Sequence, residues 1–212
     1  MVLATFESAR RSPYYQLYTP YDFQGFYMKA FKLFILDKRM QMFMIVAAAV
    51  IAVDHLVKWI IKSQMQLNQT INVIGDFFTI SYILNSGIAF GLFDSNPSPV
   101  KTPLLIVISF IALGIILYIF LTLPRDIKGA GLSMGLIFGG AIGNIVDRVV
   151  RGEVVDFLDV DFPDITIRVL NIHMTRWPTF NVADSCVLVG IIMLLVILIR
   201  HGGKSEQEQP GT

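Results

Sequence analysis

Two aspartates, Asp156 and Asp184, are the residues in this sequence best suited to chemistry. Each lies beside an apolar stretch, and a polar loop separates them. A carboxylate near hydrocarbon is energetically expensive, so its presence indicates a function. Two carboxylates that share a site cannot both ionise cheaply, and one of them then keeps a proton near neutral pH. The ionised one can take a proton from water while the other donates a proton, which is enough to hydrolyse a peptide bond.

The sequence alone does not establish that these two aspartates meet. Asp147, Asp159 and Asp161 are alternative partners, although Asp159, Asp161 and Asp164 also fit a solvated loop, where charges normally lie. Other catalytic sets are missing: there is no HExxH motif, and no histidine lies close to Ser185 in the sequence. We therefore expect neither a metal site nor a cofactor.

The elements that must position these residues are predicted by composition. The chain has 212 residues, of which 54% are hydrophobic and only 16% are charged, against about 25% charged in soluble domains. This balance indicates an integral membrane protein. The net charge of +1 argues against a nucleic-acid partner. The one cysteine, Cys186, excludes an intramolecular disulfide and is interpreted as a small core residue.

Four apolar runs of membrane-spanning length predict an α-helical membrane protein with four transmembrane helices. The predicted spans are about 40–61, 104–123, 131–150 and 180–200, within a membrane domain of residues 40–200. External segments are expected at about 62–103 and 151–179. In the first, β-branched and aromatic residues from Ile71 to Leu84 flank a Gly75-Asp76 turn, which predicts a small β-sheet lying on the membrane. In the second, residues 165–170 alternate like a strand.

The two ends of the chain differ in character. Within the leader, residues 1–39, apolar residues recur at helical spacing from Phe23 onward and lysines lie off that stripe, which favours an interfacial amphipathic helix on membrane lipids. A disordered cytosolic tail is the alternative. The leader does not resemble a cleaved signal peptide. Residues 201–212 are polar and are expected to be a disordered cytoplasmic tail.

Orientation follows from the basic residues, which are concentrated in the leader, the short loop 124–130 and the C-terminal tail. We therefore expect both termini to be cytoplasmic. Polar residues from separate parts of the chain then gather at the outer interface: Asp54, Asn85, Asn144, Asp147, Arg148, Asp156, Asn181 and Asp184. Asp54 and Lys58 are four residues apart in the order that favours ion pairing on a helix. They are either a structural anchor, with the lysine snorkelling to the interface, or part of the catalyst.

Five blocks carry a resemblance to a known family: DHLVK from Asp54, NSGIAFG from Asn85, GGAIGNIVDR from Gly139, EVVDF from Glu153 and FNVAD from Phe180. In this order the chain resembles lipoprotein signal peptidase (signal peptidase II), the aspartic protease of the bacterial inner membrane, over roughly residues 52–195. The resemblance implies that Asp156 and Asp184 are the catalytic pair. It implies supporting or substrate-binding roles for Asp54, Lys58, Asn85, Gly87, Asn144, Asp147, Arg148 and Asn181.

The resemblance also implies the substrate, a prolipoprotein whose cysteine already carries diacylglycerol and which is cut just before that cysteine. The enzyme would act as a monomer at the extracytoplasmic face, with NSGIAFG lining its pocket. Two features depart from the family: the aromatic leader, and a long loop after Phe157 that could add a lid or a strand near the site. When the resemblance is set aside, the alternatives to a peptidase are a proton- or ion-coupled transporter and a structural membrane subunit.

Overall fold

The computed structural model describes residues 37–87, 101–161, 165–167, 172–174 and 176–207. Its contacts divide the chain into two units, Met1–Gln41 and Met42–Thr212. Almost all of the first unit lies outside the described residues, and so does most of the amphipathic helix predicted in the leader. Apart from residues 37–41, all described residues belong to the second unit.

Among the described residues, four helices are long and apolar enough to cross a membrane. They are α3 (Lys38–Gln64), α4 (Lys101–Thr122), α5 (Ala130–Arg151) and α6 (Val182–Gln207). The predicted four-helix membrane fold is confirmed. α6 continues past the span expected to end at Arg200, so residues 201–207, predicted to be disordered, are helical instead. No proline lies between Arg200 and Pro210, and lysine, glutamate and glutamine from Lys204 onward favour helix, although Gly202 and Gly203 do not.

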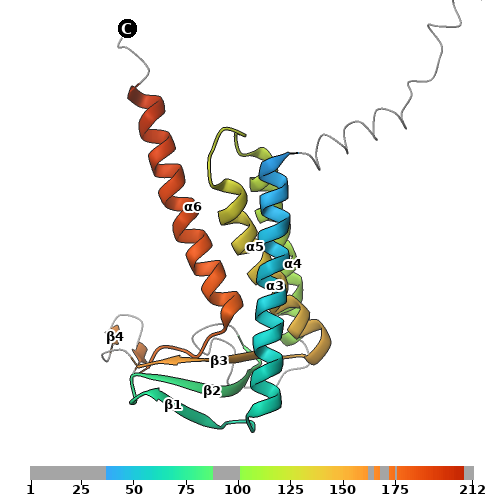
Figure 1. The fold of residues 1–212 in the computed structure, drawn as a ribbon, viewed down its shortest axis with the longest axis vertical. Coiled ribbons are helices and arrows are strands. Elements are labelled where there is room, and N and C mark those ends of the chain that lie inside the picture. The colour runs from blue at the N-terminus through green and yellow to red at the C-terminus, as the bar shows by residue number, and fades with distance from the viewer. Residues whose placement is uncertain (1–36, 88–100, 162–164, 168–171, 175, 208–212) are drawn as a thin grey trace, which may run out of the picture. The chain divides into compact units, whose positions relative to one another are not determined.

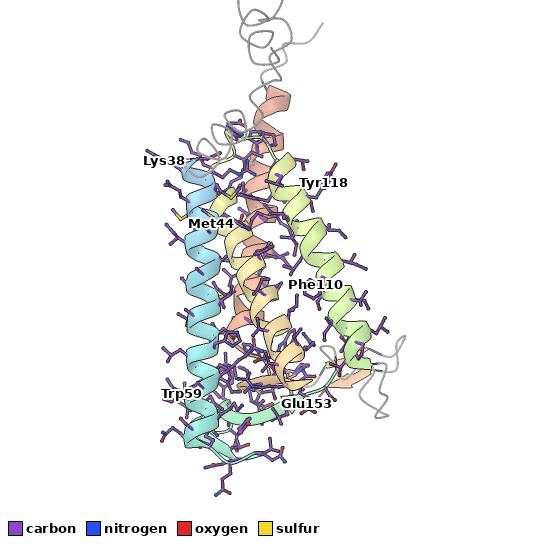
Figure 2. All side chains as sticks on the ribbon, turned by 90° about the vertical axis from the view of Figure 1, so that its right-hand side faces the viewer. Lys38, Met44, Trp59, Phe110, Tyr118 and Glu153 are labelled. Carbon is purple, nitrogen blue, oxygen red and sulfur yellow. The ribbon has the colours of Figure 1, made fainter. Side chains whose placement is uncertain are left out.

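The outward faces of the helices are apolar. Met44 and Trp59 on α3, and Phe110 and Tyr118 on α4, point away from the neighbouring helices (Figure 2) and are all exposed. Large exposed aliphatic and aromatic side chains around whole helices suit contact with lipid rather than water. The chain is therefore a multi-pass membrane protein.

Helix α5 packs closely against both α3 and α6 because it carries glycines where they meet. A β-carbon at Gly139 would lie 2.8 Å from the carbonyl oxygen of Ala47 on α3. A β-carbon at Gly140 would overlap the carbonyl oxygen of Ala183 on α6. Small residues thus let the backbones approach, as in other membrane helix pairs. This packing fixes α6 against the end of α5 that carries polar residues.

A three-stranded antiparallel sheet lies across one end of the helices (Figure 1). It has the order β1 (Thr70–Ile74), β2 (Phe78–Asn85) and β3 (Val154–Val160). The predicted small sheet is confirmed, but its third strand was not expected, because the run EVVDF does not alternate. Gly152 ends α5 with a φ of 82°, a left-handed conformation that glycine adopts without strain, and the chain turns directly into β3.

The loop after β3 forms a second, two-stranded antiparallel sheet from β4 (Ile165–Ile167) and β5 (Ile172–Met174). The strand predicted over 165–170 is therefore found as far as Ile167, and residues 168–171 lie outside the described part. The chain then returns alongside β3, where Phe180 pairs with Leu158 immediately before α6.

Candidate functional site

Asp156 lies in the middle of β3 and is only 2% exposed. Its two carboxylate oxygens each accept a hydrogen bond from an asparagine side chain. Asn85 Nδ2, at the end of β2, donates to Oδ2 over 2.8 Å, and Asn181 Nδ2 donates to Oδ1 over 2.7 Å. The antiparallel pairing of β2 with β3 brings Asn85 to this place, since Asn85 is opposite Val154. Asp156 is thus a buried carboxylate whose orientation is fixed from two sides.

Asp184 lies in the first turn of α6. Its backbone N–H donates to Asn181 Oδ1 over 2.9 Å, and the backbone N–H of Asn181 donates to Asp184 Oδ2 over 3.2 Å. This reciprocal pair is a capping box, with Asn181 as the N-cap residue of the helix. Asn144 Nδ2 on α5 donates to the other oxygen, Oδ1, over 2.7 Å. The helix start itself therefore determines where this carboxylate points.

Asn181 joins the two aspartates into one network. Its Nδ2 group bonds Asp156 and also Asn144 Oδ1, at 3.1 Å, while its Oδ1 and backbone N–H bond Asp184. By sequence alone, Asp147, Asp159 and Asp161 are also possible partners for either aspartate. The structure brings Asp156 together with Asp184, whereas Asp147 lies in a separate ionic cluster and Asp159 faces Arg176.

An ionic cluster of Asp54, Lys58 and Asp147 adjoins the asparagine network at Asn144. Lys58 is 1% exposed, and its Nζ lies 2.7 Å from Asp54 Oδ2, 2.7 Å from Asp147 Oδ2 and 3.2 Å from Asn144 Oδ1. The predicted Asp54–Lys58 pair is confirmed, but the snorkelling lysine is wrong, because two buried carboxylates hold it inside the protein. Asp54 Oδ1 also accepts the backbone N–H of Ala183 over 2.9 Å. The cluster thereby ties α3 and α5 to the start of α6.

Arg148, one turn from the end of α5, reaches the segment that follows β2. Its Nη2 donates to the carbonyl oxygen of Gly87 over 3.2 Å, and the Gly87 N–H donates to Asn85 Oδ1 over 2.8 Å. Arg148 thus supports the turn that orients Asn85 toward Asp156. The rest of the NSGIAFG block, residues 88–91, lies outside the described residues, so its predicted place in a pocket remains a prediction.

Burial and charge raise the pKa of Asp156 to about 7, from an ordinary 3.8. The largest cause is removal of the carboxylate from water, followed by repulsion from the nearby Asp184 charge. Hydrogen bonds from Asn85 and Asn181, and the positive charge of Lys58, act in the opposite direction. A carboxyl group with this pKa can hold or release a proton near neutral pH.

In the described parts of the chain, no three His, Cys, Asp or Glu side chains are grouped so that they could hold a metal ion.

Two contributors to the site were not identified from the sequence. Arg151 pairs with Asp147 four residues earlier on α5, and this spacing in acid-then-base order could have revealed it. The backbone N–H of Ala183, which bonds Asp54, carries no sequence signal. His55 lies 4.0 Å from Asp147, at the edge of the same cluster.

Fold and site together define a class: a multi-pass membrane protein with a carboxylate pair, Asp156 buried and Asp184 half-buried, where its helices meet a small sheet. The comparison with known families then specifies the member of that class. Residues 46–200 match the model of the family described as Signal peptidase (SPase) II. The chain belongs to this family, as its sequence predicted, and family membership makes it a peptidase.

Curated relatives agree over most of their length. A lipoprotein signal peptidase of Moorella thermoacetica is 36% identical over 166 residues, covering 78% of this chain and 98% of the relative. The lipoprotein signal peptidases of Geobacter metallireducens and Bacillus subtilis are 38% and 34% identical, covering 79% of this chain and 96% and 99% of theirs. The similarity to these relatives therefore covers nearly four fifths of this chain and almost the whole length of each relative.

Solved structures support the same fold. A bacterial membrane enzyme determined by the in meso method at 2.3 Å resolution superposes with a TM-score of 0.64 at 28% identity, covering 80% of this chain and 94% of that one. A second such structure, at 1.9 Å resolution, gives a TM-score of 0.59, also at 28% identity, covering 74% and 91%.

Proposed function

We propose that this protein is an aspartic endopeptidase that removes the signal peptide from diacylglyceryl-modified prolipoproteins, cutting just before the lipid-modified cysteine. The observation that carries the proposal is the pair Asp156 and Asp184, joined through the side chain of Asn181. The relatives named lipoprotein signal peptidase supply the substrate class.

The reaction uses the two carboxyl groups as a unit that shares one proton. The ionised carboxylate takes a proton from water as the water oxygen attacks the scissile carbonyl carbon. The protonated carboxyl donates its proton to the carbonyl oxygen, giving a tetrahedral diol. When the diol collapses, the carboxyl that took the proton from water gives it to the leaving nitrogen, and a diol hydroxyl returns a proton to the other carboxylate. The C–N bond breaks to give a carboxylic acid and an amine, and the pair again holds one shared proton.

The surrounding residues hold the pair in place rather than react. Asn85, Asn144 and Asn181 donate to the carboxylates and leave them little freedom to rotate. The buried cluster of Asp54, Lys58 and Asp147 fixes the helices that carry these asparagines. Arg148 and Gly87 support the end of β2 and lie where a substrate backbone could be bound. Pre-organisation of this kind lowers a barrier, because no group has to reorient during the reaction.

The site is proposed to open at the extracytoplasmic face of the bacterial inner membrane. The basic residues of the leader and the 124–130 loop favour a cytoplasmic location for both termini and for the far end of the bundle. A substrate with two acyl chains lies in the bilayer, so its scissile bond reaches the interface where the sheet meets the helices. The protein would act as a monomer surrounded by lipid.

The test is cleavage of a diacylglyceryl-modified prolipoprotein peptide by the purified protein. We expect cleavage before the modified cysteine by the wild type and loss of it in Asp156→Asn and Asp184→Asn. The matched control is Asp126→Asn, because Asp126 is an exposed carboxylate between α4 and α5. Normal cleavage by both active-site variants would refute the mechanism, and no cleavage by the wild type would refute the substrate. A reporter fused after Thr212 that is active outside the cytoplasm would refute the orientation.

A further inference from the structure

The chain that leads into α6 is attached to β3 at two places. Near the site, Phe180 exchanges backbone hydrogen bonds with Leu158, at 2.7 and 2.9 Å. Farther away, the backbone N–H of Trp177 donates to the carbonyl oxygen of Val160 over 3.2 Å. This short segment is the route by which residues after the long loop return to the sheet, and its next residue is Asn181. Figure 1 shows the start of α6 beside β3.

Arg176 stands at the far end of this segment and contacts several elements at once. Its Nε lies 3.1 Å from Asp159 Oδ1 on β3, and its Nη1 lies 3.8 Å from Asp161 Oδ2 just beyond β3. Its Nη2 donates to the carbonyl oxygen of Asp76, in the turn between β1 and β2, over 3.3 Å. Asp159 in turn accepts a hydrogen bond from Thr79 on β2 over 3.2 Å.

We propose that Arg176 is a positioning residue for the reaction, which fastens the returning chain to the sheet and thereby holds Asn181 against Asp156. The inference rests on the proposed function, since it concerns the geometry of the same carboxylate pair. Residues 162–175 lie between the end of β3 and the segment that begins at Arg176. Bringing the two ends of such a loop together costs conformational entropy. Arg176 offsets part of that cost at the base of the loop, where its side-chain contacts add to the backbone hydrogen bonds of Trp177 and Phe180 with β3.

The consequence reaches the site through Asn181. Asn181 Nδ2 lies 2.7 Å from Asp156 on β3, while the backbone of Asn181 begins α6 and caps it with Asp184. The two aspartates therefore lie on opposite sides of the junction that Arg176 closes. If the segment 177–180 moves away from β3, the Asn181–Asp156 hydrogen bond lengthens, whereas the capping box of α6 is unaffected.

The expected effect is modest, because the Arg176 side chain is 38% exposed and exposed ion pairs are individually weak. For Arg176→Gln we expect kcat to fall roughly three- to tenfold, as for two or three weak contacts acting together, with KM unchanged. Because the Asn181 hydrogen bond lowers the pKa of Asp156, its weakening should move the high-pH limb of the kcat profile to higher pH. A role only in overall stability would move neither quantity for the folded enzyme.

The experiment measures kcat, KM and the pH profile for the wild type, Arg176→Gln, Asp159→Asn and the double variant in the same detergent. We expect the double variant to be no worse than Arg176→Gln alone, because Arg176→Gln already removes the ion pair that Asp159→Asn removes. Arg176→Lys should recover part of kcat. Added salt should lower the wild-type kcat toward that of Arg176→Gln, since salt screens an exposed pair. Arg200→Gln, which removes an exposed arginine of α6, is the control and should match the wild type.

The outcomes separate this inference from the proposed function. If the wild type cleaves the lipidated peptide and Arg176→Gln has the same kcat and pH profile, the inference is wrong and the function stands. Additive losses in the double variant, or an equal loss in Arg200→Gln, also overturn it. If the wild type does not cleave, or Asp156→Asn cleaves normally, the proposed function fails and the inference fails with it.

Discussion

Replacing Asp156 with asparagine should abolish catalysis and yet make the protein relatively more stable at high pH. Burial and the Asp184 charge raise the pKa of Asp156 from 3.8 to about 7. Below pH 4 the carboxyl is protonated in both the folded and the unfolded chain. As the pH rises from 4 to 7, the unfolded chain ionises first, and the free energy of unfolding of the wild type decreases. The contribution of the protonated Asp156 carboxyl to the free energy of unfolding is thus fully present below pH 4 and is lost by about pH 7.

The magnitude follows from the two pKa values. Their difference corresponds to roughly 4 kcal/mol in total, of which roughly 2–3 kcal/mol is lost between pH 5 and pH 8.5. The free energy of unfolding of the Asp156→Asn variant does not decrease in this way, because asparagine does not ionise. The variant carries a separate cost of about 1–3 kcal/mol at every pH, because its amide group must face one of two asparagine donors. The pH-dependent difference is therefore the cleaner quantity.

The assay is unfolding of both proteins in the same detergent at pH 5 and pH 8.5, with Asp126→Asn as an exposed control. We expect the stability of Asp156→Asn relative to the wild type to increase by roughly 2–3 kcal/mol from the lower to the higher pH. Its kcat should be at least about 100-fold lower, the usual size of an acid–base contribution. Wild-type kcat should decrease above pH 7, where the pair loses its shared proton. An unchanged stability difference at the two pH values would refute the reasoning on burial.

Three further substitutions test the surroundings of the pair. Lys58→Met removes the cation that Asp54 and Asp147 share, so that Asp147 keeps Arg151 while the buried Asp54 loses its cation, and it should cost about 3–5 kcal/mol in unfolding experiments, whereas Lys62→Met, at an exposed position one turn later, should cost almost nothing. Asn181→Ala should cost about 1 kcal/mol through the lost cap and lower kcat at least about tenfold, and a variant with wild-type kcat would contradict its bridging role. Gly140→Ala should cost about 1–3 kcal/mol and lower kcat, because its methyl group would meet a carbonyl oxygen of α6. Gly114→Ala on α4, with open space around it, is the control and should not destabilise the protein.

Much of the fold was predictable because hydrocarbon imposes simple rules on sequence. A membrane span needs a long apolar run, so the four helices could be read directly from composition. The Asp54–Lys58 pair was also accessible, since residues four apart share a helix face. The third strand of the sheet was missed, because a run as short as Val154–Phe157, in which Asp156 interrupts the apolar residues, does not reveal a period of two.

The sequence by itself determined the class of protein, its family and the residues that could do chemistry. These depend on the types and order of residues, which folding does not change. Only the tertiary structure decided which aspartate faces which, and that Asn181 connects them. The reason is that Asp156 belongs to a strand and Asp184 to a helix. Their distance depends on the β2–β3 register and on close packing of α5 with α6, both of which arise from contacts far apart in sequence.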